Sequence, residues 1–217
     1  MTRKERYANF ISYFSENQPE AETELTYRTP FELLVAVVLS AQCTDKRVNI
    51  VSEKLFLDFP TAEVMAVSRF DILFPYIKSI SYPSNKTKHL LGLSQMLVNE
   101  FNGQVPMNIK ELQRMPGVGR KTANVIVSVL DQQPAMAVDT HVYRVSKRLG
   151  LVPLNAKTPL AVERQLIRHL PEASVHKAHH WLILHGRYTC VARKPKCTSC
   201  SITKFCRHYS LSNKDFK

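Results

Sequence analysis

The lysine at position 121 stands where a side chain could take part in covalent chemistry. Residues 112–130 read LQRMPGVGRKTANVIVSVL, which predicts a short helix that stops before Pro116, a tight turn, and a new helix from about Gly119. Lys121 would lie in the first turn of that new helix, away from its apolar stripe, so packing does not explain it. A neutral lysine amine can attack a sugar carbon and then hold it as a Schiff base.

The turn before Lys121 has the pattern of a helix-hairpin-helix, a motif that binds the DNA backbone without reading its sequence. Its two glycines would permit unusual backbone angles and the close approach of a ligand, and its amide groups could hold a phosphate at the helix N-terminus. Cations are disfavoured at that end of a helix, so two in succession indicate contact with an anion. The alternatives are an ordinary corner between helices and two solvated basic residues. The residues expected to contact DNA here are Pro116, Gly117, Val118, Gly119 and Arg120.

Asp139, in the segment AVDTH at residues 137–141, is a second candidate. It precedes a helical pattern, and its structural explanation is an N-cap, which needs only a short hydrogen-bond acceptor. Its chemical explanation is a carboxylate that accepts the lysine proton, or that stabilises positive charge on a sugar as a base leaves. The two roles are compatible, because an N-cap position holds a carboxylate at a helix end.

Four of the five cysteines lie within 17 residues, with the spacing C-x6-C-x2-C-x5-C. Four thiolates in one loop indicate a metal site, and the spacing leaves both zinc and a [4Fe–4S] cluster open. The loop is also basic, so a metal that fixed it would create a rigid surface for phosphate contacts. Cys43 stands apart, and we expect it to be buried within a helix. The clustered cysteines are Cys190, Cys197, Cys200 and Cys206.

The composition argues against a membrane protein and points to a polyanionic partner. Of 217 residues, 44% are hydrophobic, and 30 Lys and Arg against 18 Asp and Glu give a net charge of +12. This sign of charge suits DNA, RNA or an anionic membrane surface. No apolar run approaches the roughly 20 residues of a membrane span, and the basic N-terminus lacks the apolar core of a secretion signal. We therefore expect a cytoplasmic protein without disulfides.

Apolar residues recur at helical spacing along most of the chain, which predicts an all-α fold. Tyr7, Phe10, Ile11 and Phe14 mark a first helix, and a polar linker near residues 17–26 follows it. Thr29 and Pro30 would begin a strongly apolar helix as its N-cap and first residue. Further helices are expected near residues 44–58, 61–67, 69–77, 84–101, 108–114, 119–131, 140–149, 158–169 and 174–188.

Together these motifs resemble the endonuclease III family. The similarity extends from about Arg28 to His208, and four separate motifs occur in the order that the family shows. They are LLVAVVLSAQCTD at 33–45, MPGVGRKTANV at 115–125, AVDTHVYRV at 137–145, and HHWLILHGRYTC with its three later cysteines at 179–206.

The resemblance implies two all-α domains and a repair activity. Residues 22–133 would form a six-helix domain with the helix-hairpin-helix, and residues 1–21 plus 134–217 would form the cluster domain. The protein would be a bifunctional DNA glycosylase and abasic-site lyase that removes oxidised pyrimidines from duplex DNA. It would then cleave the strand 3′ to the abasic site by β-elimination. We expect a monomer of bacterial type, associated with the nucleoid through DNA.

The resemblance also implies residue roles. Lys121 matches the family's nucleophile, Asp139 its catalytic carboxylate, and the four clustered cysteines the ligands of one [4Fe–4S] cluster per chain. Gln42 matches a residue that enters the space left by a flipped nucleotide. Family members commonly carry Gly, then Leu or Phe, then Tyr where this chain reads SISYP at 79–83, so Tyr82 stands at the wedge position. We also expect DNA contacts from Arg144 and Lys194.

Three other functions compete with this one. The adenine-excising relatives typically lack a lysine at position 121 and carry a glutamate in the helix that corresponds to Val35 and Ala36. A thymine-mismatch glycosylase of the same fold stays open, since no motif separates it from the preferred function. A non-catalytic DNA-binding module would have no need for Lys121 together with Asp139.

Overall fold

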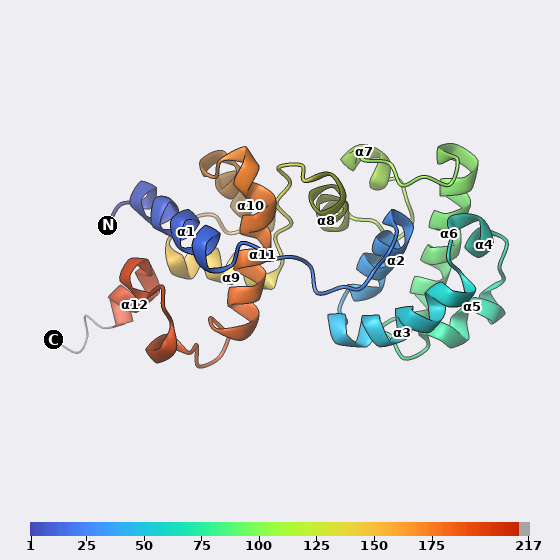
Figure 1. Ribbon diagram of the computed structural model, residues 1–217, viewed down its shortest axis with the longest axis horizontal. Coiled ribbons are helices and arrows are strands. Elements are labelled where there is room, and N and C mark those ends of the chain that lie inside the picture. Colours follow the sequence, from blue (N-terminus) through green and yellow to red (C-terminus); the bar gives the residue numbers. More distant parts are fainter. Residues whose placement is uncertain (213–217) are drawn as a thin grey trace. The chain divides into compact units, whose positions relative to one another are not determined.

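The computed structural model describes residues 1–212, and every regular element in that range is helical (Figure 1). The chain divides into two compact units, Glu24–Asp131 and Met1–Thr23 together with the chain from Gln132 onward. We call them the hairpin unit and the cysteine unit. The domain boundaries predicted from sequence, at 22 and 133, differ from these by two residues each. Within residues 1–212, no helix is both long and apolar enough to cross a lipid bilayer.

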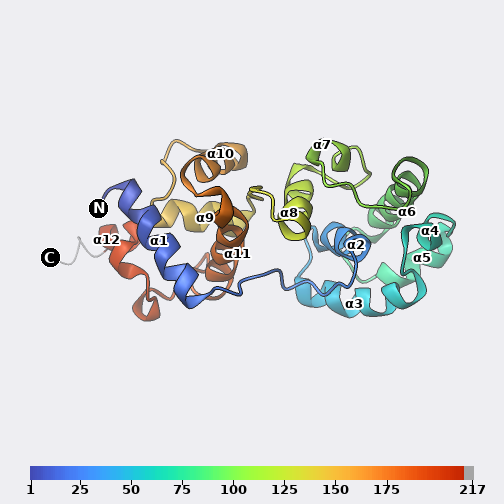
Figure 2. The same cartoon turned by 45° about the horizontal axis from the view of Figure 1, so that its top comes forward.

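The hairpin unit is built around α2, whose residues Phe31–Leu39 are all buried. This helix contacts α3, α6 and α8, and it lies between α6 and α8 in both views (Figures 1 and 2). Burial of so continuous an apolar run is the main stabilising term of the unit. The helices are α2 (Pro30–Ser40), α3 (Asp45–Asp58), α4 (Ala62–Ala66), α5 (Phe70–Ile77), α6 (Pro83–Phe101), the single turn α7 (Ile109–Leu112) and α8 (Arg120–Asp131).

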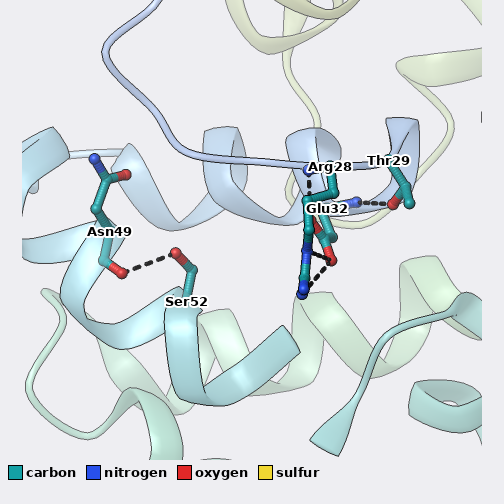
Figure 3. Close-up of polar contacts among 5 residues, drawn as sticks. All are labelled: Arg28, Thr29, Glu32, Asn49 and Ser52. Atoms are coloured by element: carbon teal, nitrogen blue, oxygen red, sulfur yellow. Dashed lines mark hydrogen bonds and ion pairs between the residues drawn. The ribbon is translucent and has the colours of Figure 1, made fainter. Parts of the chain in front are cut away.

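The N-terminus of α2 is capped as the sequence predicts. Thr29 accepts a hydrogen bond from the backbone N–H of Glu32 at 3.2 Å (Figure 3). Pro30 is the first helical residue. Glu32 is only 2% exposed, and its carboxylate lies 3.0 Å from the Arg28 guanidinium. A buried carboxylate is costly unless it is paired and hydrogen-bonded, and Arg28 meets that need here.

The chain that enters α2 is tied to α3 through Asn49. The Asn49 side chain accepts from the Thr26 N–H at 3.0 Å and donates to the Glu24 carbonyl at 2.8 Å. On α3 itself the Ser52 hydroxyl donates to the Asn49 carbonyl at 3.2 Å (Figure 3). The two bonds from the Asn49 side chain hold the entry to α2 against a neighbouring helix.

In the cysteine unit the N-terminal helix packs against helices from the other end of the chain. Tyr7, Phe10 and Phe14 of the predicted apolar stripe are buried, and its fourth residue, Ile11, is half-buried against the same core. The Trp181 ring lies 5.8 Å from the rings of both Phe10 and Phe14, and its indole N–H donates to the Gln18 carbonyl at 2.8 Å. The helices are α1 (Arg3–Asn17), α9 (Thr140–Leu149), α10 (Pro159–His169), α11 (Glu172–Tyr188), η1 (Cys197–Ser199), η2 (Thr203–Phe205) and α12 (Arg207–Ser212).

The helices predicted between residues 44 and 188 are confirmed, with each end within two residues of its predicted position. The turns η1 and η2 and the helix α12 were not predicted. All three lie around the last cysteines, where helical periodicity is too short to be recognised.

Candidate functional site

The hairpin turn, residues 116–119, is seated on α6. Gly117 has φ +80°, and a Cβ there would lie 2.9 Å from the His89 side chain. Pro116 packs on Gly92 so closely that a Cβ at Gly92 would lie 3.0 Å from the proline ring. Only glycine meets both demands at position 117, a left-handed backbone and no room for a side chain.

Gly119 differs from Gly117. Its φ lies outside the left-handed region, and a Cβ at this position would meet no atom within 4 Å. The prediction of an unusual backbone angle is therefore confirmed for Gly117 and wrong for Gly119. Nothing within the described protein requires glycine at 119, and its backbone is open to the approach of a ligand.

Lys121 is exposed in the first turn of α8, one residue after the helix begins. The buried stripe of this helix runs through Ala123, Ile126 and Val127, so Lys121 lies off it, as predicted. The α8 ladder begins at the Gly119 carbonyl, which accepts from the Ala123 N–H at 3.0 Å. The lysine amine thus stands at the end of a helix that the hairpin turn orients.

The loops that carry Gln42 and Tyr82 are far apart in sequence, and a hydrogen bond joins them. The Ser81 hydroxyl donates to the Gln42 carbonyl at 2.6 Å. Both residues have left-handed backbones, with φ 55° at Gln42 and 56° at Tyr82, and both are exposed. Cys43 follows the bend at Gln42 and is half-buried in the turn between α2 and α3. The prediction that it is buried in a helix is therefore wrong.

Asp139 is the N-cap of α9. One carboxylate oxygen accepts from the backbone N–H groups of His141 at 2.8 Å and Val142 at 2.7 Å. The other lies 2.9 Å from His141 Nδ1. When the carboxylate is ionised it only accepts hydrogen bonds, so in that state Nδ1 of His141 is the donor in this contact. Asp139 thus has the capping role that the sequence predicts, and the cap fixes the carboxylate in one orientation.

Two predicted DNA contacts lie in the cysteine unit, in different settings. The Arg144 guanidinium donates to the carbonyls of Gly186 at 2.8 Å and Cys190 at 3.1 Å, so it links α9 to α11 and to the first cysteine. Lys194 is exposed and has a left-handed backbone, with φ 52°. Arg144 has a structural role that its sequence context did not indicate, and its contact with DNA stays a prediction.

The four clustered thiols line one cavity, together with residues of α9, α11 and α12. Burial raises the pKa of the thiols of Cys200 and Cys206 above the usual value. The Cys200 sulfur lies 3.9 Å from His185 Nε2, and burial lowers the pKa of that histidine to about 4. Among residues 1–212, no three side chains of His, Cys, Asp or Glu are grouped closely enough to ligate a metal ion as they stand.

Arg148 holds the start of this loop, and its role was missed in the sequence. Its guanidinium donates to the carbonyls of Val191 at 2.7 Å and Ala192 at 2.9 Å, and one nitrogen lies 3.4 Å from the Cys190 sulfur. Arg6 of α1 donates to the Phe205 carbonyl on the far side of the loop. The signal that could have found Arg148 is its place one helical turn after Arg144, on the same face of α9.

Comparison with known proteins identifies the family. The family described as "HhH-GPD superfamily base excision DNA repair protein" matches residues 35–172. The endonuclease III of Rickettsia prowazekii (strain Madrid E) is 48% identical over 196 residues, which cover 90% of this chain and 92% of that protein. The chain belongs to the endonuclease III family. Another member, from Escherichia coli (strain K12), is 40% identical over 205 residues, 94% of this chain and 96% of that protein.

Solved structures of endonuclease III share both the fold and much of the sequence. A trapped endonuclease III–DNA covalent intermediate is 42% identical with a TM-score of 0.90, covering 98% of this chain and 99% of that chain. A non-covalent endonuclease III–DNA complex has a TM-score of 0.91 at the same identity, covering 99% and 100%. A thermostable thymine-DNA glycosylase, at 22% identity and a TM-score of 0.82, shares the fold and covers 96% of this chain and 97% of its own.

Proposed function

We propose that this protein is a bifunctional DNA glycosylase and abasic-site lyase that removes oxidised pyrimidines from duplex DNA and cleaves the strand 3′ to the abasic site. One observation carries the proposal. Lys121 stands exposed at the start of α8, directly after the hairpin turn, in a chain 42% identical to a trapped endonuclease III–DNA covalent intermediate. A covalent intermediate needs a nucleophile, and a lysine amine forms one that can be reduced and trapped.

The proposed reaction begins when the deprotonated Lys121 amine attacks C1′ of the damaged nucleotide. A carbon–nitrogen bond forms, and the bond from C1′ to the base breaks, so the base leaves with the electron pair and takes up a proton. The nitrogen on C1′ then loses a proton, the bond from C1′ to the ring oxygen breaks, and that oxygen takes up a proton, which opens the sugar ring and gives an imine. Loss of a proton from C2′ then breaks the bond between C3′ and its oxygen, and water releases the free amine from the imine.

Asp139 is the proposed carboxylate partner in this reaction. Positive charge develops on the sugar as the base leaves, and a fixed carboxylate stabilises it without having to reorient. The three hydrogen bonds to Asp139 from His141 and Val142 suit an ionised acceptor held in place before the reaction begins. His141 is therefore proposed to position Asp139.

The four clustered cysteines are proposed to hold one [4Fe–4S] cluster. Four thiols around one cavity supply the ligand set that such a cluster takes, and the Arg148 guanidinium beside the Cys190 sulfur suits a thiolate. When bound, the cluster would cross-link the loop and hold its exposed cations as a surface for phosphates. These cations are Arg193, Lys194 and Lys196.

Duplex DNA with damaged bases or abasic sites is the proposed partner of a monomeric, cytoplasmic enzyme. The hairpin turn would hold a backbone phosphate through its amides, at the N-terminal end of α8. Gln42 and Tyr82 would fill the gap that an extruded nucleotide leaves in the stack. The proposed contacts are Gln42, Tyr82, Pro116, Gly117, Val118, Gly119, Arg120, Arg144 and Lys194.

Borohydride trapping tests the proposal. Duplexes carrying an oxidised pyrimidine, a thymine mismatch or no lesion are incubated with the protein and reductant, and cross-linked protein and nicked strand are measured. We expect trapping and nicking on the oxidised pyrimidine, and neither with Lys121→Ala or Lys121→Gln. Lys121→Gln should still bind DNA, because the hairpin amides remain. Undiminished trapping by Lys121→Ala would show that another residue is the nucleophile. Activity on the thymine mismatch alone would refute oxidised pyrimidines as the substrate.

A further inference from the structure

Lys86 is a buried lysine in α6 to which the proposed chemistry gives no role. It is 5% exposed, and burial lowers its pKa. Its ammonium donates to two carbonyls at the end of α2, to Leu39 at 2.8 Å and to Ala41 at 2.7 Å. The last carbonyls of a helix have no partner within the helix and carry partial negative charge, which a cation satisfies.

The same residue is also bonded to the loop that carries Tyr82. The Lys86 backbone N–H donates to the Tyr82 carbonyl at 3.1 Å, while its side chain holds Ala41, the residue before Gln42. The Ser81 hydroxyl adds the direct bond to the Gln42 carbonyl at 2.6 Å. Two ties therefore join the two loops. One runs from the Ala41 carbonyl through Lys86 to the Tyr82 carbonyl, and the other joins Ser81 to the Gln42 carbonyl.

Both exposed residues have a backbone that needs such support. A left-handed conformation at a residue other than glycine is strained and persists only where the surroundings impose it. Gln42 and Tyr82 both adopt it, at φ 55° and 56°. The two bends set the directions of the Gln42 and Tyr82 side chains, and the bonds of Lys86 and Ser81 connect the two bends.

We propose that Lys86 and Ser81 form a bracket that sets the positions of Gln42 and Tyr82 relative to one another, so that both side chains enter the DNA stack together. The inference rests on the proposed function, in which these two side chains fill the gap at a flipped nucleotide. Lys86 and Ser81 are positioning residues, because they act through the two side chains and do not themselves contact DNA. The bracket governs recognition of the damaged site and leaves binding of undamaged DNA to the hairpin turn and the surface cations.

The test compares Lys86→Met and Ser81→Ala with Lys88→Met, which removes an exposed lysine from the same helix. Affinity is measured for a duplex with an uncleavable abasic analogue and for the same duplex undamaged. We expect both bracket variants to lose about tenfold in affinity for the abasic duplex, equivalent to about 1.4 kcal/mol, with undamaged binding nearly unchanged. Lys88→Met should weaken both equally through lost charge.

A double-mutant cycle separates positioning from a general loss of structure. In a background with both Gln42 and Tyr82 replaced by alanine, Ser81→Ala should have no further effect on discrimination, since it acts through those side chains. The Ser81 hydroxyl lies at the surface, so this variant folds even if Lys86→Met does not. A full effect of Ser81→Ala in that background, or unchanged discrimination in both bracket variants, would overturn the proposal.

Amide hydrogen exchange in the free protein distinguishes failure of the bracket from failure of the proposed function. If the bracket exists, Lys86→Met should accelerate exchange in segments 41–43 and 79–83 together, whereas Lys88→Met should not. A wild-type protein that binds abasic and undamaged DNA equally would refute the proposed function, while the exchange still reports on the bracket. Exchange that rises in only one of the two segments would refute the bracket alone.

Discussion

Replacing the two hairpin glycines with alanine, one at a time, should produce different defects: Gly117→Ala should lose stability, and Gly119→Ala should lose affinity for DNA. At Gly117, alanine would have to adopt φ +80° and would place its Cβ 2.9 Å from His89. The left-handed backbone alone costs about 1–2 kcal/mol, and the clash adds to it. At Gly119 no atom lies within 4 Å of the new Cβ, so Gly119→Ala should leave the free energy of unfolding unchanged or raise it by about 0.4–1 kcal/mol.

Gly119→Ala should weaken DNA binding even though it does not destabilise the fold. Its methyl group would occupy the open space through which a phosphate reaches the hairpin amides. Loss of one hydrogen bond to a charged group costs about 1.5–3 kcal/mol, or about 10- to 150-fold in Kd. The slope of log affinity against log salt should fall by about 0.9, the value of one phosphate contact.

Two measurements decide the matter. Urea unfolding gives the stability of both variants, and fluorescence anisotropy with an uncleavable abasic duplex, at several salt concentrations, gives affinity and slope. Gly119→Ala should be as stable as the wild type but bind weakly, while Gly117→Ala should be the less stable of the two. A Gly119→Ala protein that binds with wild-type affinity and slope would refute the reasoning, because the open glycine would then have no ligand.

Three further predictions test other parts of the protein. Asp139→Asn should keep the N-cap, since asparagine caps as well as aspartate, and should leave unfolding nearly unchanged while base release slows by several powers of ten; Asp139→Ala should also lose about 1 kcal/mol of stability, measured by urea unfolding. Cys197→Ala should lose the iron and sulfide of the proposed cluster and weaken DNA binding, whereas Cys43→Ala should retain both in chemical iron and sulfide assays; one zinc and no iron in the wild type would refute the cluster. Burial lowers the pKa of His180 to about 3, so this residue stays neutral in the fold but takes up a proton when unfolded below its usual 6.5. Stability should therefore be complete above pH 6.5 and fall by up to about 3 kcal/mol towards about pH 4, and His180→Gln should flatten that dependence in urea unfolding against pH.

Local rules predicted the helices and the cap of α2 from the sequence. Periodicity placed α9 at its observed bounds, and Thr29 with Pro30 placed the start of α2, because helix formation and capping depend on residues within about one turn of each other. The same rules failed at Cys43, whose turn depends on a left-handed bend at Gln42 that the local sequence does not require. They also failed around α12, where contacts with α9 replace periodicity.

The sequence by itself determined which residue types are available for chemistry: a lysine after a glycine turn, an aspartate before a helix, and four cysteines in one loop. Only the tertiary structure decided how they are supported. Lys86 bonds carbonyls 45 and 47 residues away, and Arg148 bonds carbonyls 43 and 44 residues away. Such bonds join a side chain to a distant backbone, and no local spacing encodes them. The two hairpin glycines look alike in the sequence, but a Cβ would meet His89 at Gly117 and no atom within 4 Å at Gly119. Only the packing around each glycine reveals this difference.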